Sequence, residues 1–62
     1  MGEIVIGNGK ITAEGVTIEV AMLSAGEYPD AFLYLYNGKP VPMTAVIGKE
    51  MIIEALRVAS GG

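Results

Sequence analysis

This 62-residue chain contains no histidine or cysteine, so its candidate nucleophiles are hydroxyl groups and its candidate acid–base pair would consist of carboxylates. Ser24 and Ser60 therefore have no imidazole base, and no lysine follows a serine at the spacing of a Ser-Lys dyad. This composition argues against a serine or cysteine hydrolase. We expect a protein that is not an enzyme.

The carboxylates offer one pair that the predicted strand register brings together, Glu3 and Glu14. Two carboxylates are few for a calcium site, which usually gathers about six or more oxygen ligands. We therefore interpret them as solvated groups at a frayed sheet end, and Glu27 and Asp30 as ordinary polar residues of a loop. We expect no metal and no cofactor.

A glycine-rich segment, Gly7 to Lys10, superficially resembles part of a phosphate-binding loop. Such a loop needs a helix directly after it, because the first backbone N–H groups of the helix bind the phosphate. A strand is predicted here instead. We do not expect phosphate binding at this segment.

Turn signals and apolar alternation predict the strands. A two-residue loop at Asn8-Gly9 would place Ile6 opposite Ile11, and a second loop at Glu14-Gly15 would continue the chain as a three-stranded meander from Glu3 to about Leu23. One predicted face carries the aliphatic residues Ile4, Ile6, Ile11, Ala13, Val16, Ile18, Val20 and Met22.

A second hairpin is predicted around Asn37-Gly38, between residues 31–36 and 39–43. Pro40 and Pro42 fall where the missing N–H would point away from the partner strand, which predicts a sheet edge. Beyond Gly48 the pattern predicts a helix over Lys49–Ala59, with Gly61 as its stop and Ile53 as an apolar exception on the polar side. The fold prediction is one α+β domain over residues 1–62, with four to five strands and a C-terminal helix on one sheet face.

Both faces of the second hairpin are apolar, and one helix covers only one face of a sheet. We therefore expect self-association, most simply as a two-fold dimer that presents an assembled surface to a protein partner. A strongly twisted sheet that folds both faces into one core is the alternative. The predicted interface comprises Val5, Phe32, Tyr34, Tyr36, Val41, Met43 and Ile53.

The row Phe32, Tyr34 and Tyr36 suggests a second function, because aromatic rings at period two on a sheet can stack on unpaired bases. The net charge of −3 argues against it, since phosphate contacts supply much of the affinity for nucleic acid. Binding of single-stranded nucleic acid is thus the alternative to self-association. No apolar run is long enough to span a membrane and no secretory leader is apparent, so the expected location is the cytoplasm.

The pair Gly61-Gly62 resembles the tail of ubiquitin-like modifiers. In that family the diglycine follows the final strand of the fold. Here it follows a predicted helix, and the match covers two residues. The sequence therefore favours helix termination as the interpretation of these glycines.

Overall fold

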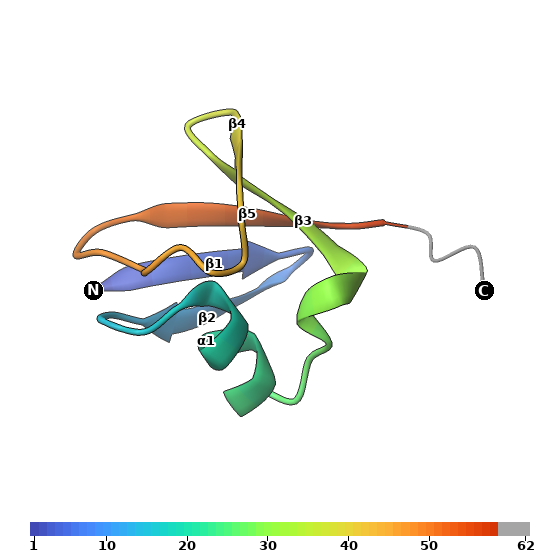
Figure 1. The fold of residues 1–62 in the computed structure, drawn as a ribbon, viewed down its shortest axis with the longest axis horizontal. Helices are drawn as coiled ribbons and strands as arrows, with labels where there is room; N and C mark the ends of the chain where they lie inside the picture. The colour runs from blue at the N-terminus through green and yellow to red at the C-terminus, as the bar shows by residue number, and fades with distance from the viewer. Residues whose placement is uncertain (59–62) are drawn as a thin grey trace.

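A computed structural model gives the fold, and it describes residues 1–58. The strands form one five-stranded mixed sheet in the order β2-β1-β5-β3-β4, in which β1 and β5 are parallel and the other neighbours antiparallel (Figure 1). The elements are β1 (Gly2–Ile6), β2 (Gly9–Ala13), α1 (Ile18–Ser24), the 3-10 helix η1 (Pro29–Ala31), β3 (Phe32–Tyr36), β4 (Lys39–Val41) and β5 (Ile52–Arg57).

The α+β class is confirmed, but the predicted C-terminal helix is wrong. Residues 52–57 form β5, which lies between β1 and β3 in the middle of the sheet. Ile53, the exception on the predicted helix, is the clue: Ile53 and Ala55 are buried while Ile52, Glu54 and Leu56 are exposed, a period of two. Strand β5 has a neighbouring strand on each side and buries one of its faces in the core. A segment in that position needs apolar side chains at every second residue, which residues 52–57 supply on the buried face. Gly61, the predicted helix stop, lies outside the described residues.

The predicted third strand of the meander is also wrong, because residues 18–24 form α1. The Thr17 side chain accepts a hydrogen bond of 3.2 Å from the backbone N–H of Val20 and caps the helix. Ile18, Ala21 and Met22 are buried at the i, i+3, i+4 spacing of a helical face, whereas Val20 is exposed. Gly15 does turn the chain, with a φ of 77°, but into a helix and not into a strand.

The first hairpin forms with its loop at Gly7-Asn8, one residue earlier than predicted. Ile6 pairs with Gly9 and Ile4 with Ile11, so every cross-strand pair is shifted by two residues. A two-residue shift leaves each side chain on its predicted face. Gly7 has the positive φ (54°) that the first position of a type II′ loop requires.

The second hairpin is confirmed at Asn37-Gly38, where both residues have positive φ (53° and 79°) as a type I′ loop requires. Tyr36 pairs with Lys39 and Leu35 with Pro40. Strand β4 forms one edge of the sheet, and Pro40 is compatible with that position because it has no N–H to donate outward.

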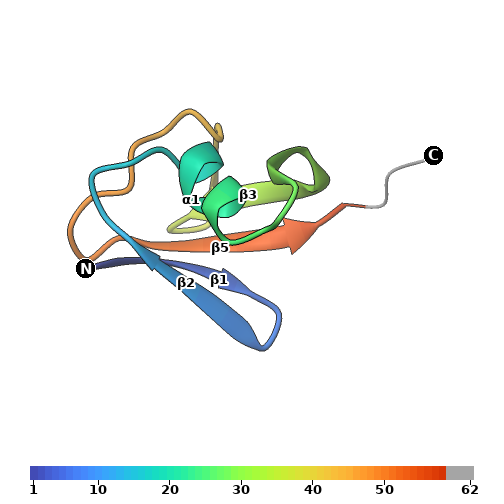
Figure 2. The same cartoon turned by 90° about the horizontal axis from the view of Figure 1, so that it is seen from below.

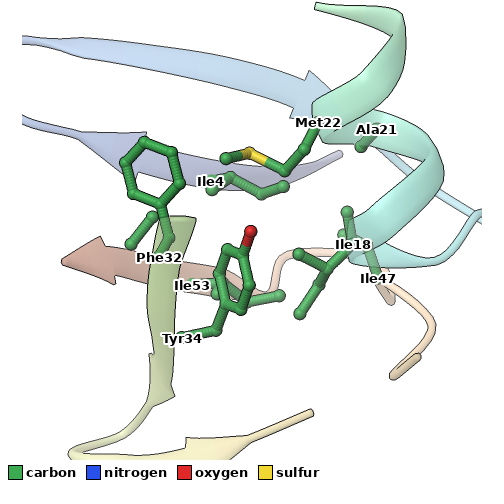
Figure 3. Close-up of a cluster of buried hydrophobic side chains, with 9 residues drawn as sticks. Ile4, Ile18, Ala21, Met22, Phe32, Tyr34, Ile47 and Ile53 are labelled. Atoms are coloured by element: carbon green, nitrogen blue, oxygen red, sulfur yellow. The ribbon is translucent and has the colours of Figure 1, made fainter. Parts of the chain in front are cut away.

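One face of the sheet carries the core. Figure 2 shows α1 and η1 on the same side of β5, and in Figure 3 Ile18 and Met22 of α1 point toward Ile4 and Ile53 of the strands. The connection from β4 to β5 closes this core, because Ile47 is fully buried and exchanges backbone hydrogen bonds with Gly15 and Val16. Neither helix in the described part of the chain is long and apolar enough to cross a membrane.

Candidate interaction surfaces

Three residues of the predicted interface lie in the core of the single chain. The exposed fractions of Phe32, Tyr34 and Ile53 are 8%, 3% and 0%. The shared face of Phe32 and Tyr34 was predicted correctly, whereas Ile53 was assigned to a helix. The helical layer covers this face of the sheet, so the three side chains are buried within the single chain. The prediction that they form an exposed interface is therefore corrected.

The other predicted interface residues have different positions. Tyr36, Val41 and Met43 are half-buried and pack against the core cluster from the β3–β4 side of the molecule. Val5 is half-buried and alternates to the opposite face of the sheet. Of the predicted set, Val5 therefore lies on the sheet face that α1 leaves uncovered.

Burial also changes the prediction of base stacking. The rings of Phe32 and Tyr34 lie side by side, with centroids 6.4 Å apart, beneath the helical layer. The guanidinium of Arg57 lies 5.8 Å from the centroid of the Phe32 ring. Bases could reach these two rings only if the helical layer moved away. Phe32 and Tyr34 are therefore core residues, whereas Tyr36, the third residue of the row, is half-buried.

The sheet face opposite α1, called the open face below, is apolar. Leu33 pairs directly with Leu56 across β3 and β5, and Ile52 is 60% exposed. Both faces of the second hairpin were predicted to be apolar, which accounts for Leu33 and Leu35. Ile52 and Leu56 were predicted to lie in a helix, so their place beside these leucines was not foreseen. The apolar residues of the open face are Val5, Leu33, Leu35, Ile52 and Leu56.

A single carboxylate stands in the middle of the open face. Glu54 on β5 pairs across the sheet with Val5 on one side and with Leu35 on the other. The one salt bridge within residues 1–58 does not involve Glu54. It joins Lys10 Nζ to Glu3 Oε2 at 3.3 Å. Glu54 therefore has no ionic partner within the described chain, whereas Glu3 has one.

A surface hollow surrounds this carboxylate. Its lining comes from three strands and the second hairpin loop: Val5, Leu35, Asn37, Gly38, Ile52 and Glu54. An apolar wall with one carboxylate suits a side chain that combines an aliphatic stem with a positive charge.

The two carboxylates of the predicted pair, Glu3 and Glu14, do not face each other in the sheet. Glu3 pairs with Thr12 and not with Glu14, because the register differs by two residues from the predicted one. Among the described residues, no three His, Cys, Asp or Glu side chains form a group that could hold a metal ion. No charged side chain in this part of the chain is buried.

Val58, the last described residue, directly follows β5. The backbone N–H of Val58 donates a 3.0 Å hydrogen bond to the carbonyl oxygen of Ala31, which holds the strand end beside the start of β3. Ala59 and Ser60 follow Val58 in the sequence, and Gly61-Gly62 comes next. The diglycine itself lies outside the described residues, but the element before it is the final strand and not a helix.

No known protein family matches the sequence, and no curated protein shows significant similarity to it.

Proposed function

We propose that this chain is a small non-enzymatic carrier of the ubiquitin-like type, whose Gly61-Gly62 tail is activated and transferred by a partner protein. The observation that carries the proposal is the strand β5 in place of the predicted helix. The diglycine now follows the last strand of the sheet, as it does in ubiquitin-like modifiers. The predicted helix before the diglycine was the difference from ubiquitin-like modifiers, and the structure has a strand there instead.

The topology supports the same class. The hairpins β1–β2 and β3–β4 flank the central strand β5, which runs parallel to β1, and helix α1 lies on a single face of the sheet. This arrangement resembles the β-grasp, the fold of ubiquitin-like proteins. Fold alone does not define a function, so the proposal depends on the combination of this topology with the diglycine that follows it.

The chemistry proposed for the tail needs no catalytic group from this chain. A carboxylate is a poor acyl donor until its oxygen becomes part of a better leaving group. Attack of a glycine carboxylate on the α-phosphorus of ATP releases pyrophosphate and leaves an acyl adenylate. A sulfur or amine nucleophile then displaces AMP. Two glycines suit this step because they carry no side chain to hinder entry into the partner's active site.

The experiment is to express the protein from its own chromosomal gene with an N-terminal tag. The tagged protein is purified from these cells, and the mass of its C-terminal peptide is measured. The expected product has Gly62 as its last residue and bears sulfur in place of one carboxylate oxygen, or an amide bond to an amine. A Gly62→Ala variant and a variant with one extra alanine after Gly62 should both lose the modification. The proposal is overturned if the mature chain continues beyond Gly62, or if only the free carboxylate is found under every growth condition.

Self-association remains a second candidate, favoured by the apolar open face. Light scattering after size exclusion over a wide concentration range tests it. A mass that stays at one chain would remove it, and a stable dimer would support it.

A further inference from the structure

We infer that the edge strand β2 pairs with β2 of a second copy of this chain, antiparallel and centred on Thr12, so that two sheets join into one. The surface is the edge of the sheet and not its open face, and the inference does not rest on the diglycine tail. It rests on the hydrogen-bonding groups along β2 and on the self-complementary sequence of residues 10–14.

The two edges of the described sheet differ in how they are protected. Strand β4 contains Pro40, and Pro42 follows it, so this edge lacks N–H groups at alternate positions. Strand β2, at the other edge, contains no proline. Its single charged residue, Lys10, is already neutralised by Glu3 at 3.3 Å. The β2 edge is therefore the one that is available for pairing.

The hydrogen-bonding groups on that edge belong to alternate residues. Glu3 lies opposite Thr12, but its backbone N–H donates in the other direction, to the carbonyl oxygen of Met51. The Glu3–Thr12 pair is therefore a non-hydrogen-bonded pair of the hairpin, and so is the Val5–Lys10 pair two residues along. In such pairs the backbone N–H and C=O groups of the β2 residue point away from β1. Lys10 and Thr12 thus offer these groups to a further strand.

The residues along this edge are complementary to themselves when two copies run antiparallel. With a two-fold axis at Thr12, the two Thr12 residues face each other, and Lys10 faces Glu14 of the second copy. Residues 10, 12 and 14 share one side of the strand when its alternation continues one residue beyond Ala13. Threonine pairs and opposite charges are both favourable across strands. Glu14 forms no salt bridge within residues 1–58, so it is available to this lysine.

The other side of the strand places a large residue against a small one. Ile11 is the cross-strand neighbour of the buried Ile4, so both lie on the side of the sheet that α1 covers. With the same axis, Ile11 faces Ala13 of the second copy. A hollow lies beside Ala13, between β2 and α1, and its apolar lining includes Val16 and Val20. The isoleucine of each copy can therefore enter the hollow of the other, which buries apolar surface on both.

A pair of charge variants tests this register. Glu14→Lys leaves two lysines on the edge and Lys10→Glu leaves two glutamates, so each variant alone would place like charges opposite each other. We expect each to associate roughly fivefold or more weakly than the unmodified protein. An equimolar mixture restores both attractive pairs and should associate within about twofold of the unmodified chain. NMR of one labelled variant, with the other added unlabelled, should show shift changes at residues 10–14, and the spectra also report that each variant is folded.

A proline variant tests the hydrogen bonds. Thr12→Pro removes the N–H that points outward and keeps those that point toward β1, so it should abolish association, whereas the matched Thr12→Val should retain it. The charge variants decide the question even if the proline variant unfolds. The inference is overturned if the mixture associates no more tightly than either charge variant alone, if the concentration-dependent shifts fall on the open face or on β4, or if the protein stays a single chain at millimolar concentration.

Discussion

The hydroxyl group of Tyr34 donates a 2.7 Å hydrogen bond to the carbonyl oxygen of Pro29 in the protein interior. The bond connects the middle of β3 to the first residue of η1, and both residues are buried. It satisfies the one polar atom of a side chain that otherwise packs among aliphatic groups. The aromatic residue of the core is thus also an anchor for the segment that leads from α1 into the sheet.

Removal of this hydroxyl should destabilise the fold. Tyr34→Phe leaves the Pro29 carbonyl oxygen without its donor, and we expect the free energy of unfolding to fall by about 1 to 2 kcal/mol. Tyr28→Phe is the matched control, because Tyr28 is 77% exposed and should change stability by less than about 0.5 kcal/mol. Urea unfolding of the three proteins measures the difference, and equal losses in both variants would contradict the assigned role.

The same hydroxyl predicts a loss of stability in alkali. Burial, and secondarily the negative charge of Asp30, raise the pKa of Tyr34 above its ordinary value of 10.0. A raised pKa in the folded state means that the unfolded chain loses this proton first. The contribution to stability is therefore complete below about pH 10 and is lost as the pH rises through the folded-state pKa. Unfolding curves should show a steeper decline above pH 10 in the unmodified protein than in Tyr34→Phe.

Adjacent isoleucines distinguish a strand from a helix at residues 52–57. Ile53→Ala leaves a cavity in the core and should cost about 2 to 5 kcal/mol of unfolding free energy. Ile52→Ala acts on the open face and should cost no more than about 1 kcal/mol. In the predicted helix Ile52 would be the buried residue of the two. A larger loss for Ile52→Ala would therefore contradict the strand.

A close approach of three segments occurs at Gly2. A Cβ atom there would overlap the side chain of Ile47 and would lie 2.6 Å and 2.8 Å from the carbonyl oxygens of Gly48 and Ala13. We expect Gly2→Ala to lower the free energy of unfolding by about 1 to 3 kcal/mol. Gly9→Ala, where the nearest atom would be 3.8 Å away, should change it by less than about 0.5 kcal/mol. Thermal unfolding of the pair checks this contact, and equal stabilities would refute it.

The second hairpin could be predicted from the sequence because its signal is local and unambiguous. Asn37-Gly38 supplies both positive φ values, and Pro40 marks the strand as an edge. The first hairpin offered two choices, since Gly7-Asn8 and Asn8-Gly9 both form two-residue loops. Their registers differ by two residues, and both leave the aliphatic residues on one face. The pattern therefore gave the faces correctly but could not decide the loop.

The two elements predicted wrongly, residues 18–24 and residues 52–57, have apolar patterns that fit both the strand period of two and the helical period of 3.6. Ile18 and Met22 lie four residues apart, which fits one face of a strand and one face of a helix equally well. Residues 52–57 have the same ambiguity, which tertiary structure resolves: the two hairpins need a strand between them to complete the sheet. This misassignment also concealed the open face, because Ile52, Glu54 and Leu56 reach it only as residues of a strand.

The central place of β5 has a consequence for the timing of folding during synthesis. Without residues 52–57 the described chain holds two separate hairpins, and a two-stranded hairpin is at best marginally stable in water. The backbone N–H of Glu3 finds its acceptor, the carbonyl oxygen of Met51, only after residue 51 has been synthesised. In the same way, Ile4 gains its cross-strand neighbour only when Ile53 is present. Nascent chains that have not yet exposed Arg57 outside the ribosome will therefore remain sensitive to proteases, and protection will appear in a single late step.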